Sequence, residues 1–167
     1  MSQSYRPEIK LDQTAIDKFT DKFSFASLLI LLVLPAMAYA DLPDQIPIHF
    51  NFKGEADNYG SKIMIWLLPV IGTAIYALLN WLSKHPEKYN YPVELHEGNA
   101  HFQYQNSVRM MCVMNAVLTM TFAYLVYLTI QMAQGNRTDL GTWTLPILMG
   151  LILVPVGYFT WQAYRNR

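Results

Sequence analysis

Residues 23–40 read FSFASLLILLVLPAMAYA, a stretch without a charged side chain and long enough to cross a membrane. Three later stretches, residues 63–82, 108–133 and 143–163, are similarly apolar, and the only charge among the four is Arg109 near the start of the third. A transmembrane helix needs about 20 mostly apolar residues. Only helices and closed barrels satisfy their backbone hydrogen bonds inside lipid. The sequence therefore predicts four transmembrane helices.

The composition agrees with a membrane protein. Hydrophobic residues make up 53% of the 167 residues and charged residues 14%, compared with about 25% charged residues in soluble chains. Four spans leave no room for a separate soluble domain of ordinary size. We therefore expect one membrane domain over residues 1–167, an all-α integral membrane bundle of four transmembrane helices with an ordered extracytoplasmic loop at 41–62.

The distribution of basic residues predicts the orientation, although the net charge is zero. With a cytoplasmic amino terminus, only Lys53, Lys62 and Arg137 lie outside. The inner side then holds Arg6, Lys10, Lys18, Lys22, Lys84, Lys88, Arg109, Arg165 and Arg167. The positive-inside rule favours this arrangement, with both termini in the cytoplasm. No basic patch with stacking aromatics suggests nucleic-acid binding.

The lead-in before the first span, residues 1–22, has amphipathic spacing. Leu11, Ala15, Ile16, Phe19 and Phe23 recur at helical intervals, with charged residues between them. This spacing predicts a short helix in the headgroup layer on the cytoplasmic side. The alternative is a tail without regular structure.

The outer loop, residues 41–62, is rich in Pro, Gly and Asn, which favour turns. Ile46, Ile48, Phe50 and Phe52 alternate with other residues. This period of two predicts an extended segment with one apolar face. The candidate ligand-binding residues of the loop are Asp44, His49, Asn51, Asp57 and Lys62.

Two other interpretations of this loop stay open. His49 and Asp57 are candidate ligands of a divalent metal, although their spacing matches no named metal loop. Alternatively Asp44, Asn51 and Asp57 hydrogen-bond turn amides and hold the loop as a rigid cap over the helices. No cofactor other than such a metal is indicated.

The second and third spans carry matching polar stripes. Thr73, Tyr76 and Asn80 have the same spacing as Cys112, Asn115 and Thr119. Antiparallel packing would pair Thr73 with Thr119, Tyr76 with Asn115 and Asn80 with Cys112. We therefore expect interhelical polar contacts, each worth about 0.6 kcal/mol in a membrane. The alternative is a path for a substrate.

The loop also carries a long motif. Its elements are Leu42, Pro43, Ile46, Pro47, His49, Phe50, Asn51, Gly54, Asp57, Gly60 and Lys62. They closely resemble the signature of a bacterial membrane family catalogued as domain of unknown function 1648. A looser resemblance covers residues 90–93 and then Glu97, Asn99, Ala100, Gln103 and Tyr104.

The resemblance implies a multi-pass protein of the bacterial cytoplasmic (inner) membrane. Most of that family has no assigned activity, and its best-known relatives are sporulation-delay toxin immunity proteins. This implies as partners a peptide, a toxin or another membrane protein, besides the lipid bilayer.

Three hypotheses about function follow. The first is a binding, sensing or immunity-like module that uses the 41–62 loop. The second is an accessory subunit or a small transporter completed by homo-oligomerisation. The third is a membrane enzyme with a metal site in the outer loop. Nucleophilic catalysis is not indicated, because the sequence has no nucleophile-elbow, phosphate-loop or dinucleotide-binding motif.

Overall fold

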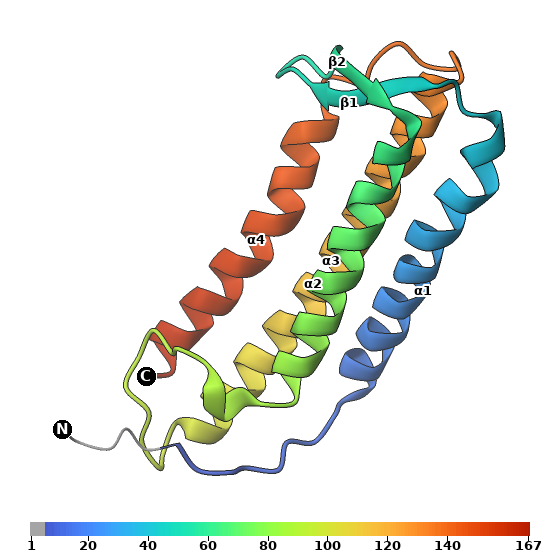
Figure 1. Cartoon of the computed structure of the whole chain (residues 1–167). Helices are drawn as coiled ribbons and strands as arrows, with labels where there is room; N and C mark the ends of the chain where they lie inside the picture. Colours follow the sequence, from blue (N-terminus) through green and yellow to red (C-terminus); the bar gives the residue numbers. More distant parts are fainter. Residues whose placement is uncertain (1–5) are drawn as a thin grey trace.

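The computed structural model describes residues 6–167, and four long helices dominate it (Figure 1). The helices are α1 (Ala15–Ala38), α2 (Leu67–Ser83), α3 (Ala100–Ala133) and α4 (Thr144–Arg165). A hairpin of β1 (Gln45–Phe50) and β2 (Ala56–Ser61) lies between α1 and α2. The short helices are η1 (Tyr39–Asp41), η2 (Lys62–Trp66) and η3 (Pro86–Lys88).

All four helices are long and apolar enough to span a membrane. The candidate spans run over Ala15–Asp41, Lys62–Ser83, Ala100–Ala133 and Thr144–Arg165. This confirms the predicted fold class: the chain is a multi-pass membrane protein with an all-α bundle and an ordered segment between its first two helices.

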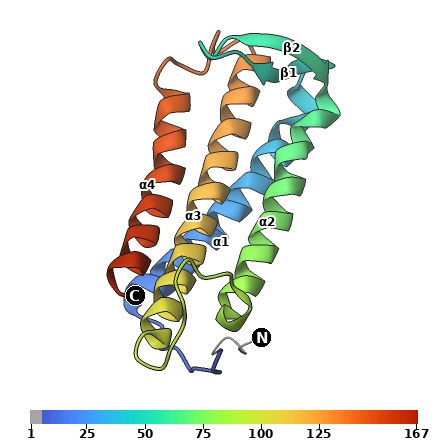
Figure 2. The ribbon, with the colours of Figure 1, turned by 90° about the vertical axis from the view of Figure 1, so that its left-hand side faces the viewer.

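The hairpin caps one end of the bundle, and the carboxyl terminus lies at the opposite end (Figure 1). The first described residues, which precede α1, also lie at that opposite end (Figure 2). Both ends of the described chain therefore face the same side, as an even number of spans requires.

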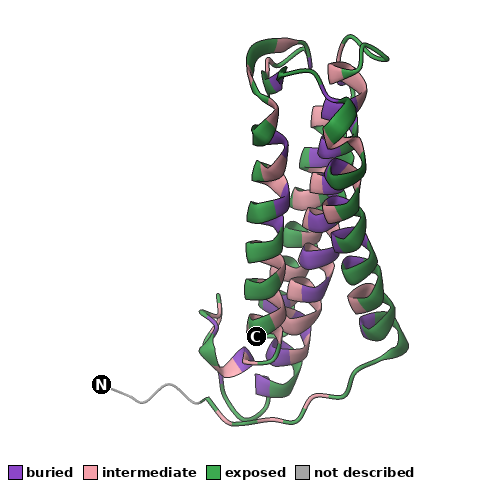
Figure 3. Ribbon diagram, turned by 45° about the vertical axis from the view of Figure 1, so that its right-hand side comes forward, coloured by how far each residue is buried: buried purple, intermediate pink, exposed green. Residues whose placement is uncertain are grey.

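Helix α3 is the centre of the bundle and packs against α1, α2 and α4. Helix α4 packs mainly against α3 and stands away from α1 and α2. In the most apolar window of α4 only 11% of residues are buried, against 44% in α3. Exposed and half-buried turns accordingly dominate α4 in Figure 3. Most of the surface of α4 therefore faces lipid or a partner.

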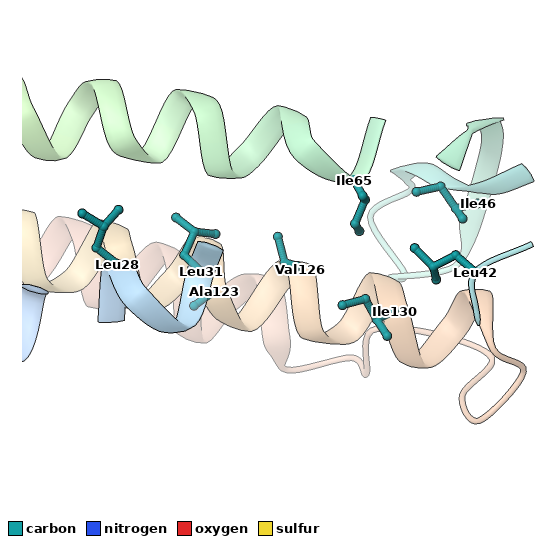
Figure 4. Close-up of a cluster of buried hydrophobic side chains, with 8 residues drawn as sticks. All are labelled: Leu28, Leu31, Leu42, Ile46, Ile65, Ala123, Val126 and Ile130. Atoms are coloured by element: carbon teal, nitrogen blue, oxygen red, sulfur yellow. The ribbon is translucent and has the colours of Figure 1, made fainter. Parts of the chain in front are cut away.

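A buried apolar cluster joins the hairpin to the helices (Figure 4). It contains Leu28, Leu31, Leu42, Ile46, Ile65, Ala123, Val126 and Ile130. Leu31 and Ile46 are 0% and 1% exposed. Because lipid tails are as apolar as these side chains, close packing holds such contacts within the bilayer. The cluster thus fixes the hairpin on the end of the bundle.

The expected single apolar face of the loop is wrong beyond Ile46. The strands pair antiparallel with register shifts between Pro47 and His49 and between His49 and Phe50. Such a bulge breaks the alternation of side chains between faces. As a result Pro47 is buried, Ile48 is 39% exposed and Phe52 is completely exposed.

The first helix begins at Ala15, earlier than the predicted span at 23–40. Thr14 and Asp17 form a capping box: the Thr14 hydroxyl accepts from the Asp17 amide, and the Asp17 carboxylate accepts from the Thr14 amide. Within 6–22, residues 15–22 therefore form the first turns of α1 rather than a separate helix. Residues 1–5 of the predicted lead-in lie outside the described residues.

Candidate functional site

The tip of the hairpin is built around Asn51. Its side-chain carbonyl accepts from the amides of Lys53 (2.8 Å) and Glu55 (3.1 Å). Its side-chain nitrogen donates to the Glu55 carboxylate at 2.9 Å. Gly54 completes the turn with a φ of +82°, a conformation that side chains disfavour. Asn51, a predicted ligand-binding residue, therefore holds the turn.

The hairpin tip is fastened to the loop between α3 and α4. The Leu140 amide donates to the carbonyl of Gly54 at 2.8 Å, and Glu55 pairs with Asp139 as an isolated bridge. A Cβ on Gly54 would lie 3.2 Å from the Cβ of Leu140, a tight contact. Leu140 itself is 1% exposed. The hairpin is therefore held both by the apolar cluster and by the loop that joins α3 to α4.

Asp44 and Lys62 join the open end of the hairpin. The Lys62 amide donates to the Asp44 carbonyl at 3.0 Å, and the Lys62 ammonium lies 3.5 Å from the Asp44 carboxylate. The ammonium also lies 5.5 Å from the centre of the Tyr39 ring. Both predicted ligand-binding residues thus make contacts within the protein.

His49 and Asp57 face each other across the two strands. Nδ1 of His49 lies 2.5 Å from Oδ1 of Asp57, although the side chains remain 67% and 42% exposed. Exposed ion pairs contribute only about 0–1 kcal/mol to stability. The pair therefore adds little to folding, and its side chains stay accessible.

Apolar side chains accompany this pair. Phe52 at the tip is completely exposed, and Tyr59 in β2 is 57% exposed. Tyr59 pairs with Pro47, next to the pairing of His49 with Asn58. The hairpin thus presents a His–Asp pair and aromatic rings on a rigid two-stranded platform.

The structure brings together only two of the side chains that a metal would need. Among residues 6–167, no group of three or more His, Cys, Asp or Glu side chains is placed to hold a metal ion. Structural zinc sites use four protein ligands and catalytic sites three. His49 and Asp57 alone fall short of either arrangement.

The polar stripes of α2 and α3 make one direct interhelical hydrogen bond: the Asn115 side chain donates to the backbone carbonyl of Tyr76 at 3.3 Å. The Thr73 and Thr119 hydroxyls bond to carbonyls of their own helices. Asn80 lies beside Tyr76, one turn away on α2. Cys112 lies beside Asp21 of α1.

Other polar contacts between helices were not predicted. Gln103 donates to the carbonyls of Ala163 (3.0 Å) and Asn166 (2.9 Å), which closes the end of α4. Asn106 donates to the Phe159 carbonyl at 2.9 Å. The side chains of Gln103 and Asn106 precede the predicted span at 108–133. A search for polar residues within the predicted spans therefore misses them.

An ion pair links α1 to α3. The Arg109 guanidinium lies 3.3 Å from the Asp17 carboxylate, which is only 6% exposed. Both residues are near the end of the bundle opposite the hairpin. In the sequence, Arg109 itself indicates such a contact, because a charge at the edge of an apolar stretch needs a partner or water.

The loop before α3 forms an aromatic cluster. The ring of Tyr91 stacks on Tyr89 and Tyr104, with centroids 6.0 and 5.5 Å apart. Burial raises the pKa of Tyr89 and Tyr91 well above its ordinary value, so both phenols stay neutral. Asn99 accepts from the His96 amide and donates to the Glu94 carbonyl. The looser part of the motif therefore shapes this loop.

Comparison with known proteins finds one matching domain in the first half of the chain. A family model described as a domain of unknown function, DUF1648, matches residues 26–73, which include the second half of α1, the hairpin and the start of α2. An uncharacterized protein of the archaeon Archaeoglobus fulgidus is 27% identical over 63 residues. That alignment covers 38% of this chain and 34% of the relative, so the chain spans about a third of the relative's length. No solved structure matches. The chain therefore contains a DUF1648 domain at residues 26–73.

Proposed function

We propose that the chain is a binding or sensing module that recognises its ligand with the hairpin of β1 and β2. The accessible pair of His49 and Asp57 carries the proposal. The Asn51 side chain holds the turn, and the backbones of Asp44 and Lys62 join the open end of the hairpin. The His–Asp pair combines polar groups and high exposure on a paired two-stranded support.

The neighbouring rings favour a peptide or protein ligand over an ion. Aromatic side chains supply much of the energy at protein interfaces, and Phe52 and Tyr59 are both well exposed. A His–Asp pair beside them offers directional hydrogen bonds. An immunity-like role, which the family resemblance implies, would use this same face to bind a toxin.

We further propose that the hairpin lies outside the cytoplasm of a bacterial cell, with both termini inside. Nine Lys and Arg residues fall on the side of the termini and three on the side of the hairpin. Such an excess marks the cytoplasmic side of inner-membrane proteins. The hairpin would then meet ligands that arrive from outside the cell.

The test places a photo-crosslinking amino acid at Tyr59 of the full chain and activates it in intact cells. We expect a covalent adduct of defined mass that is lost in the Asp57→Asn variant. The Asp41→Asn variant is the matched control, because Asp41 is an exposed carboxylate just before the hairpin. An adduct unchanged by Asp57→Asn, or no adduct at all, would contradict the proposal.

A second candidate is a subunit of a larger membrane assembly, including a homo-oligomer. The low burial of α4 favours this candidate, since only 11% of the residues in its most apolar window are buried. Native mass spectrometry of the protein released from nanodiscs gives the stoichiometry directly. A strictly monomeric result in lipid and in detergent would remove the homo-oligomer.

A further inference from the structure

The space between α1 and α4 forms a groove whose floor is α3. Its volume is about 560 Å³, within the range of roughly 300–1,000 Å³ typical of small-molecule sites. Helix α3 contributes residues from Val113 to Tyr124, a length of about 16 Å at 1.5 Å per residue. Thr20 and Phe23 of α1 lie on one side and residues from Thr144 to Leu151 of α4 on the other.

The groove is apolar and lies at the depth of the membrane. No ionisable Asp, Glu, Lys, Arg or His side chain is among its lining residues. Thr20 and Thr144 use their hydroxyls on carbonyls of their own chain segments, Ile16 and Leu140. Water is therefore a poor occupant, and the surrounding bilayer supplies apolar chains at high concentration.

One polar atom of this lining is unsatisfied. The Thr121 side chain is 94% buried, because the residue is 6% exposed, and its hydroxyl has no hydrogen-bond partner within residues 6–167. The antiparallel register set by Gln103 with Ala163 and Asn106 with Phe159 places Thr121 about level with Thr144. Thr121 therefore lies at the hairpin end of the groove.

A cationic side chain, that of Arg137, lies at the same end of the groove. A Cβ on Gly141 would lie 3.5 Å from the Thr144 hydroxyl and 3.6 Å from a guanidinium nitrogen of Arg137. Thr144 lines the groove, so Arg137 is close to its mouth. The nearby Asp139 carboxylate accepts from the Gly141 amide and the Thr138 hydroxyl. In the described part of the chain Arg137 forms no ion pair.

We propose that this groove binds one anionic phospholipid from the leaflet on the hairpin side. Its phosphate lies on Arg137, an ester carbonyl accepts from the Thr121 hydroxyl, and one acyl chain follows the groove past Val117 and Leu151. The three elements occur in the same order as in a phospholipid: charge outermost, then an acceptor, then hydrocarbon. The site is independent of the hairpin's proposed ligand.

Native mass spectrometry tests the proposal with protein reconstituted in nanodiscs of mixed phosphatidylglycerol and phosphatidylcholine. The wild-type chain is expected to retain one phosphatidylglycerol per protomer. Leu151→Trp fills the groove from α4, while Leu153→Trp makes the same change on the same helix outside the groove. Both positions are well exposed, at 49% and 60%. Retention should fall at least fivefold in Leu151→Trp and stay at the wild-type level in Leu153→Trp.

Two polar variants test the headgroup end. Arg137→Gln should abolish the preference for phosphatidylglycerol over phosphatidylcholine, whereas Lys53→Gln, another cation on the hairpin side, should keep it. Thr121→Val, which conserves the side-chain shape, should reduce retention of both lipids. A wild-type chain without retained lipid, equal retention in the two tryptophan variants, or a second copy of the chain in place of lipid would overturn the proposal.

Discussion

Gly72 of α2 lies so close to Leu31 of α1 that a Cβ on the glycine would be 2.6 Å from Cδ2 of the leucine. The same Cβ would be 3.0 Å from Cδ2 of Phe122 in α3. Small residues allow membrane helices to approach closely. Helices α1, α2 and α3 thus meet at one glycine.

Replacing that glycine should loosen the bundle. Gly72→Ala is expected to destabilise the protein by about 1–3 kcal/mol, because fully buried Leu31 must move to make room. Denaturant titration in detergent, followed by helical circular dichroism, measures the change. Gly150→Ala in α4 is the control, since nothing lies within 4 Å of its added Cβ. Equal losses in both variants would show that the close approach is unimportant.

The Gln103 side chain should hold the end of α4. Gln103→Leu removes the donor to the carbonyls of Ala163 and Asn166. We expect a loss of about 0.6–1.7 kcal/mol, the range of polar contacts between membrane helices. Hydrogen exchange of residues 160–167 should rise in this variant and remain unchanged in Gln105→Leu, where the side chain is only half-buried. Unaltered exchange in Gln103→Leu would count against the contact.

Asp17 should stabilise the start of α1. Asp17→Ala breaks both the capping box with Thr14 and the ion pair with Arg109. Loss of a cap alone costs about 0.5–2 kcal/mol. Thermal unfolding should therefore occur at lower temperature in Asp17→Ala, and not in Asp12→Ala, which changes an exposed carboxylate of the lead-in. A similar melting temperature for Asp17→Ala and the wild type would refute this role.

The proposed orientation can be tested by labelling single cysteines in intact cells. A membrane-impermeant maleimide should modify a Lys53→Cys variant at the hairpin and spare a Lys84→Cys variant at the opposite end. Both variants carry Cys112→Ser, which removes the native thiol. The reverse labelling pattern would place the hairpin in the cytoplasm.

The hairpin should not retain a metal ion at full occupancy. His49 and Asp57 provide two protein ligands where stable zinc sites use three or four. Elemental analysis of the purified protein should find far less than one divalent metal per chain, and a chelator should leave the melting temperature unchanged. One equivalent of metal that disappears in Asp57→Asn would revive the enzyme hypothesis.

The helices could be predicted from the sequence because lipid imposes a simple condition. Long stretches without charge can only be helices when their backbone must satisfy itself. The predicted span at 143–163 agrees closely with α4, from Thr144 to Arg165. The start of α1 could not be placed as well, since Thr14 and Asp17 act through a local cap in a charged region.

The site was harder to predict than the helices. The sequence indicated a rigid cap, and Asn51 does bond to turn amides as that interpretation expected. The bulge beside Pro47 could not be read from alternation, because one shifted residue exchanges the faces of those that follow. The fastening of Gly54 to Leu140 joins residues far apart in sequence and depends on how the helices pack.

That hydrogen bond couples the turn of the hairpin to the start of α4. Leu140 lies just before α4, a helix that the rest of the bundle barely covers. A ligand that lifts the turn must either break the bond between the Leu140 amide and Gly54 or pull the top of α4 with it. Tension at the tip would then reach the far side of the membrane along a single helix.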